Sequence, residues 1–211
     1  MLFHEIAHAL DYRVMMANKD YDWKGSYPSR VLHDTIKEDY DELVKRFNDK
    51  AVERAKGLVA EHGGVFSKEL FEAAYKAGDI GNFAYKWYKD NPKIEHLPTA
   101  YLIALGEKDY TGKKPKMHKS SGAWHLRKEI CAKPRVMGAV CDAFIFKNGA
   151  VYNVGHDKSY YKKWGSKADA METFANLFAL YAADDKKTIE EVEKYLPRTC
   201  KRFKEFVKDN S

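Results

Sequence analysis

The feature that most constrains this chain is the pattern His4-Glu5-x-x-His8, which lies within residues 3–12. Residues four apart share one face of a helix, so His4 and His8 can present two imidazoles to one metal ion. Glu5 lies beside them, where a carboxylate can accept a proton from metal-bound water. The neighbouring residues are mostly apolar, which predicts a buried helix. The alternative interpretation is a helix that merely carries two histidines on a partly buried face.

A zinc site with two histidines from one helix needs a third protein ligand and an open position for water. The best candidate is Glu172, the one acid within the apolar part of a helix predicted over residues 167–183. A buried carboxylate without a partner is costly, and a metal ion would remove that cost. The alternative is a glutamate that is neutralised by an Arg or Lys, or that lies at the helix edge near solvent.

Asp11 falls on roughly the same helix face as His4 and His8, at offsets of seven and three residues. There it can accept the outer N–H of a ligating imidazole. A helix cap or a salt bridge is an equally good role for this carboxylate.

Apolar spacing together with Gly and Pro positions predicts a mainly α protein with one β-hairpin, an α+β class in a single domain over residues 1–211. The hairpin is expected over 144–153, where Asn148-Gly149 separates two β-prone runs. Residues 30–110 have the pattern of a helical insertion lobe. The longer predicted helices cover residues 2–18, 29–62 (as one helix or two), 67–77, 80–91, 167–183 and 188–208, the last interrupted near Pro197. Shorter helices are predicted over 93–105, 123–133 (ended by Pro134) and 136–142.

Composition narrows the function classes. The net charge of +6 comes with lysines spread over the whole sequence, which is typical of a solvated surface, so we do not expect nucleic-acid binding. The basic segment Lys113–Lys119 lacks the interleaved aromatic residues of a nucleic-acid site. Three cysteines without a C-x-x-C pattern favour a reducing compartment and give no cysteine zinc site. The sequence has no run of ~18 apolar residues and no signal peptide. We therefore expect no membrane partner, and we expect a cytoplasmic location.

Two stretches of the sequence carry a family resemblance. The run H-E-x-x-H-A-x-D at His4–Asp11, paired with E-x-F-A-x-x-F at Glu172–Phe178, resembles the gluzincin metallopeptidases. The likeness is closest to the branch with the anthrax lethal factor catalytic domain and the clostridial Pro-Pro endopeptidases. The run Gly155-His156-x-x-x-Tyr160 also looks like zincin-like domains of phage or prophage minor capsid and head-morphogenesis proteins. The resemblance covers about residues 2–12 and 140–182.

Residue by residue, the resemblance implies that His4, His8 and Glu172 bind Zn²⁺ and that Glu5 is the general base. Asn176 stands where that branch has a second acidic residue, and an amide cannot hold a histidine as an anion would.

The family also places near the metal a tyrosine that stabilises the oxyanion, but Gly165 occupies its position here. Tyr160 is the preferred substitute and His156 a second candidate donor. Tyr161 is the remaining alternative.

The resemblance implies a zinc metallopeptidase that hydrolyses a protein or peptide substrate, or its own parent chain. An alternative is a catalytically inactive zincin-like structural domain of a phage particle, with a phage head protein as parent or partner and the bacterial cytoplasm or the particle as location. A basic nucleic-acid-associated module is a third, weaker hypothesis. The metal motif begins at residue 4, so we expect the N-terminal sheet of such a domain to be missing and the chain to be a fragment.

Overall fold

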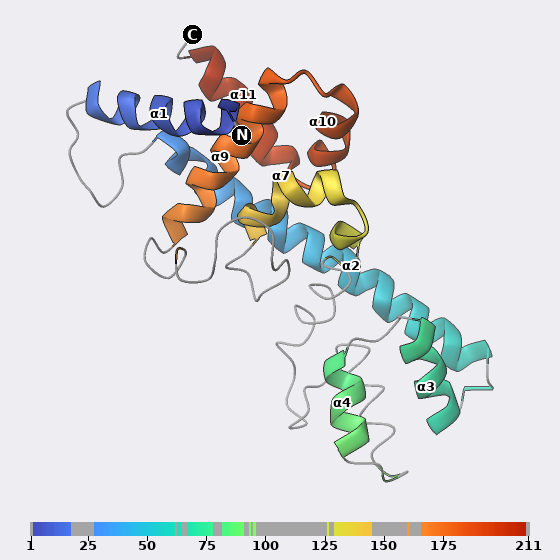
Figure 1. Cartoon of the computed structure of the whole chain (residues 1–211). Helices are drawn as coiled ribbons and strands as arrows, with labels where there is room; N and C mark the ends of the chain where they lie inside the picture. Colours follow the sequence, from blue (N-terminus) through green and yellow to red (C-terminus); the bar gives the residue numbers. More distant parts are fainter. Residues whose placement is uncertain are drawn as a thin grey trace. The chain divides into compact units, whose positions relative to one another are not determined.

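A computed structural model of the chain is shown in Figure 1, and it describes residues 2–17, 28–61, 63–64, 67–77, 82–90, 93, 95, 126, 129–144, 160 and 166–209. The regular elements in these ranges are all helices, and no strand occurs among them, which confirms the mainly α class. The predicted β-hairpin was to begin at Phe144, but this residue ends a helix. The rest of that hairpin, residues 145–153, lies outside the described residues.

The chain forms two compact units, Met1–Asp41 with Glu129–Ser211, and Glu42–Lys128. The insertion lobe predicted over 30–110 overlaps the second unit. The first unit holds α1 (Leu2–Ala17), the 3₁₀ helix η1 (Pro28–Leu32), α7 (Pro134–Phe144), α9 (Ser166–Ala182), α10 (Lys186–Glu193) and α11 (Pro197–Asp209). Helix α2 (His33–Glu61) starts in the first unit and continues into the second, which also holds α3 (Lys68–Ala77) and α4 (Asn82–Asp90).

Helix α9 is the central element of the first unit. Helices α1 and α7 pack along it, and η1, α10 and α11 also contact it (Figure 1). A helix that is apolar on most of its surface is suited to such a position, because each of its faces finds an apolar neighbour. Phe174 shows this packing, with its ring 5.4 Å from that of Phe203 and 5.7 Å from that of Phe206 on α11.

Helix α1 is less buried than its composition predicts. Ala7 and Asp11 are buried against the rest of the unit, whereas Leu2 is 73% exposed and Phe3 is 43% exposed. Ile6 and Leu10 continue the exposed apolar face. The prediction of a buried helix is therefore wrong for this face, because only the histidine-bearing side of α1 meets α9.

Helix α11 is joined to α2 through a buried aspartate. Pro197 opens α11, where its missing N–H costs nothing. The next two backbone N–H groups, of Arg198 and Thr199, donate to the carboxylate of Asp39 on α2 at 3.2 and 2.9 Å. The predicted interruption near Pro197 is confirmed, since α10 ends at Glu193.

The second unit has an aromatic cluster of its own. The Phe71 ring on α3 lies 4.9 Å from the Tyr88 ring on α4, and Tyr75 stacks on Tyr85 with centroids 3.7 Å apart. Across both units, none of the described helices has the length and apolar character needed to cross a membrane.

Candidate metal centre

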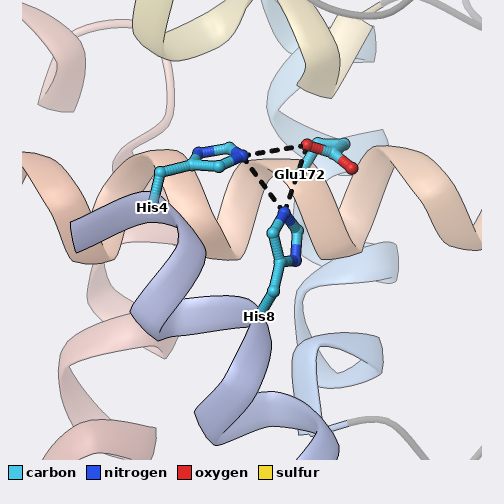
Figure 2. A group of neighbouring side chains, drawn as sticks. All are labelled: His4, His8 and Glu172. Atoms are coloured by element: carbon cyan, nitrogen blue, oxygen red, sulfur yellow. Dashed lines mark hydrogen bonds and ion pairs between the residues drawn. The ribbon is translucent and has the colours of Figure 1, made fainter. Parts of the chain in front are cut away.

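Two helices bring together the three predicted metal ligands. Figure 2 shows the rings of His4 and His8, both on α1, turned toward the carboxylate of Glu172 on α9. The Nε2 atoms of the two histidines are 3.1 Å apart. Glu172 Oε2 lies 3.3 Å from His4 Nε2 and 3.5 Å from His8 Nε2. One ligand atom from each residue therefore faces a common point, where the three could hold a metal ion.

Local sequence explains each half of this arrangement. The i, i+4 spacing stacks His4 and His8 on the side of α1 that also carries buried Ala7. The carboxylate of Glu172 is 1% exposed, as expected for an acid inside the apolar stretch of α9. Among the described residues, the two imidazoles form ion pairs with this carboxylate.

Hydrogen bonds alone leave two of the three facing atoms in conflict with each other. A hydrogen bond needs a proton on one atom and a lone pair on the other. Among three mutually adjacent atoms, at least two must present the same kind of group to each other, either two protons or two lone pairs. A cation between His4, His8 and Glu172 would accept a lone pair from each and remove this conflict.

The pKa of His8 is raised above its ordinary value. The hydrogen bond to Glu172 raises the pKa of His8, burial lowers it, and the charges of Glu172, Glu5 and Asp11 raise it further. In the metal-free protein these contacts favour an imidazolium paired with the buried carboxylate. A metal ion has to displace that proton, so its affinity would fall with falling pH.

Tyr160 lies at the site, as predicted, but with a different contact. Its hydroxyl donates a 2.6 Å hydrogen bond to Glu172 Oε1, the oxygen that is not paired with the histidines. A phenol has one proton, so Tyr160 cannot donate to an oxyanion while it donates to Glu172. In this arrangement the tyrosine orients the carboxylate and leaves Oε2 directed at His4 and His8.

Asp11 links α1 to η1 through a hydrogen bond. It is buried, and its Oδ1 accepts a 2.9 Å hydrogen bond from the backbone N–H of Ser29 in η1. Burial raises the pKa of this carboxyl group, and the Ser29 N–H and the His8 charge lower it. The capping role left open by the sequence is thus observed, and no hydrogen bond from a histidine ring to Asp11 occurs among the described residues. Its Oδ2 is buried there with no hydrogen-bond partner.

Asn176 follows Glu172 by one helical turn, and its partner was not predicted. Its Nδ2 donates a 2.9 Å hydrogen bond to Oδ2 of Asp142, which is buried on α7. The amide is therefore tied to an acid rather than to a histidine. Asp142 is the one acid in the apolar helix α7, so the signal that identifies Glu172 would also have identified Asp142.

Glu5 is exposed and borders an open hollow of about 520 Å³ next to the candidate ligand His4. His4 and Asn176 also line this hollow. The proposed general base is thus accessible to a molecule that enters the hollow. The other candidate donors, His156 and Tyr161, lie outside the described residues.

Three comparisons with known proteins find no match. They comprise a scan against protein-family models, a search of curated proteins and a search of solved structures.

Proposed function

We propose that this chain is a zinc-dependent metallopeptidase of gluzincin type. The observation that carries the proposal is the convergence of His4 Nε2, His8 Nε2 and Glu172 Oε2, with separations of 3.1, 3.3 and 3.5 Å. The pairing of α1, which carries the two histidines, with α9, which carries the glutamate, is the helix pair that a zincin-like fold would require.

The donor set and its dimensions suit zinc. With bonds of about 2.0–2.1 Å, two ligand atoms of a regular tetrahedron lie about 3.3–3.4 Å apart. The three observed separations scatter around that value. Two imidazole nitrogens and one carboxylate oxygen form the protein part of several catalytic zinc sites, in which the fourth position remains open.

When bound, such an ion supplies Lewis-acid chemistry, which makes a water molecule more acidic and polarises a carbonyl oxygen. The Glu5 carboxylate, at the edge of the hollow, takes a proton from water while the water oxygen forms a bond to the carbonyl carbon of the peptide. The C–N bond then breaks, and Glu5 returns the proton to the departing amine nitrogen. Water is consumed, and a carboxylic acid and an amine are released.

The remaining residues of the site hold the candidate metal ligands in position. Tyr160 holds Glu172 Oε1, so the other oxygen stays directed at the histidines. Asp11 fixes α1 to η1 through Ser29, and this contact helps to hold His8, one turn earlier on α1, in place. To stabilise an oxyanion, Tyr160 would have to release Glu172. The prediction that Tyr160 or His156 is the oxyanion donor is tested by the same peptide-hydrolysis assay that tests Glu5.

The test is hydrolysis of a mixed peptide library by the zinc-reconstituted chain, read by mass spectrometry. Glu5→Gln should lower the rate by about 10²-fold or more while it leaves the zinc content unchanged. Glu190→Gln is the matched control, because Glu190 is an exposed acid on α10 outside the hollow. Equal rates for the wild type and Glu5→Gln would refute the catalytic role. Zinc binding without cleavage of any peptide would favour the inactive structural domain.

A further inference from the structure

The hollow that His4 and Glu5 border extends along the contact between helices α7 and α9. The Asn176–Asp142 hydrogen bond joins α9 and α7 near one end of the hollow. Beyond it, later residues of α9 lie opposite earlier residues of α7, so the two helices run antiparallel along the hollow. Its lining residues are His4, Glu5, Arg135, Gly138, Ala139, Asn176, Ala179, Leu180 and Thr188.

The charges in this lining are separated. Glu5 supplies the carboxylate, on α1 beside the metal ligands, and Arg135 supplies the guanidinium, in the first turn of α7. Most other lining groups are small or apolar. Gly138 and Ala139 lie between Arg135 and the Asp142 end of α7, so no large side chain of this helix divides the hollow.

Arg135 is available to a ligand. Its side chain is exposed, and within the described part of the chain its guanidinium forms no hydrogen bond or ion pair. The charge of Arg135 acts on the carboxylate of Asp185. The pKa of Asp185 is lowered mainly by hydrogen bonds from the Thr188 hydroxyl and backbone N–H, and further by the charge of Arg135. Because Asp185 already caps α10 through Thr188, its carboxylate does not occupy the five donors of the guanidinium.

We propose that Arg135 binds a carboxylate of the peptide substrate, three to four residues from the bond that is cleaved. This inference rests on the proposed function, because it takes the three ligands as the place of cleavage. Arg135 supplies the guanidinium that attracts an anion at the end of the hollow away from Glu5. The substrate is thereby oriented along the hollow, and the carboxylate belongs either to the chain terminus or to an Asp or Glu side chain.

The length of the hollow sets this spacing. Leu180 lies eight residues after Glu172 on α9, which is about 12 Å along the helix axis. An extended peptide advances about 3.3 Å per residue. A carboxylate near the far end of the hollow is therefore three to four residues from a peptide bond held beside His4 and Glu5.

The first experiment measures binding, which does not depend on turnover. Zinc-loaded Glu5→Gln protein is titrated into fluorescein-labelled pentapeptides, and binding is followed by anisotropy. In the first pair, one peptide has a free C-terminal carboxylate and the other has a C-terminal amide. A second, amidated pair differs in one internal Asp against Asn. A charge-assisted contact predicts about tenfold tighter binding for the carboxylate member of one pair. The pair that responds identifies the source of the carboxylate.

Arg135→Gln in the same background should remove that difference and leave the neutral peptides unchanged. Arg135→Lys should restore part of it. Arg202→Gln, which removes an exposed arginine from α11, should have no effect. Melting curves of the variants check that α7 remains folded.

The proposal is overturned if no peptide binds, if neither pair shows a preference, or if Arg135→Gln weakens charged and neutral peptides equally. Failure of the proposed function has a different signature. In that case the Arg135-dependent preference is present in the binding assay, while the wild-type chain cleaves none of the same peptides.

Discussion

The hydroxyl of Tyr160 donates a 2.6 Å hydrogen bond to Oε1 of Glu172, and Oε2 of the same carboxylate lies 3.3 and 3.5 Å from the two histidine nitrogens. The two oxygens thus have separate tasks, one held by the tyrosine and one directed at the imidazoles. This division makes Tyr160 a positioning residue for the candidate metal ligand.

Removal of this hydroxyl should weaken metal binding rather than the fold. Tyr160→Phe leaves the ring in place and frees Glu172 Oε1, so the carboxylate can rotate away from His4 and His8. Partners that orient a ligand are worth about 10- to 100-fold in metal affinity, and the Kd for zinc should rise by that factor in a competition titration with a chromophoric chelator.

A matched control exists on α9, the helix that carries Glu172. The Tyr181 hydroxyl donates a 2.8 Å hydrogen bond to Glu193 Oε1, a tyrosine–glutamate pair away from the metal ligands. Tyr181→Phe should leave the zinc Kd unchanged. If both variants lose affinity equally, Tyr160 has no specific role at Glu172.

Removal of zinc should lower thermal stability. A metal bound across α1 and α9 stabilises the folded chain in proportion to the logarithm of its concentration over Kd. Excess EDTA should therefore lower the melting temperature of the zinc-loaded protein by about 10 °C. In Glu172→Gln the shift should be absent, because the third ligand is lost. A wild-type protein whose melting curve ignores EDTA would contradict a metal bridge between these helices.

The candidate ligand cluster could be predicted from sequence because each part is a local signal. The spacing of His4 and His8 places them together on any helix, and Glu172 is an acid in an apolar helix. Tyr160 was predicted from a family resemblance as an oxyanion donor. Its bond to Glu172 depends on the path of the chain between them, which spacing does not determine.

Other contacts could not be predicted because they depend on tertiary packing. Asp11 binds the backbone N–H of Ser29, a partner set by how the chain returns to α1. The Asn176–Asp142 bond depends on the register of α9 against α7. The exposure of Phe3 and its apolar neighbours was also missed, since hydrophobic content alone does not say which helix face is covered.

Asp39 should be a major stabilising residue of the first unit. Its buried carboxylate accepts the backbone N–H groups of Arg198 and Thr199, the Thr199 hydroxyl and the Arg198 guanidinium. Asp39→Ala leaves these donors without an acceptor and should cost about 2–4 kcal/mol in free energy of unfolding by urea. Asp34→Ala, at an exposed position of the same helix, should cost far less. Similar losses in the two variants would show that the cap is not required.

The three cysteines should differ sharply in reactivity. Burial raises the pKa of Cys141 and that of Cys200 to about 12, whereas Cys131 is exposed. At pH 8 the buried thiols are about one part in ten thousand thiolate, the reactive form. Ellman's reagent should therefore titrate one thiol rapidly in the native protein and two more after denaturation. Rapid reaction of all three in the folded chain would contradict the burial of Cys141 and Cys200.

The stoichiometry of bound zinc tests the central claim most directly. Zinc-reconstituted protein, dialysed against metal-free buffer and measured by inductively coupled plasma mass spectrometry, should hold about one zinc per chain. His8→Ala and Glu172→Gln should each hold almost none, and Glu5→Gln should hold as much as the wild type. A wild-type chain that retains no zinc, or variants that retain as much as the wild type, would contradict a metal centre at His4, His8 and Glu172.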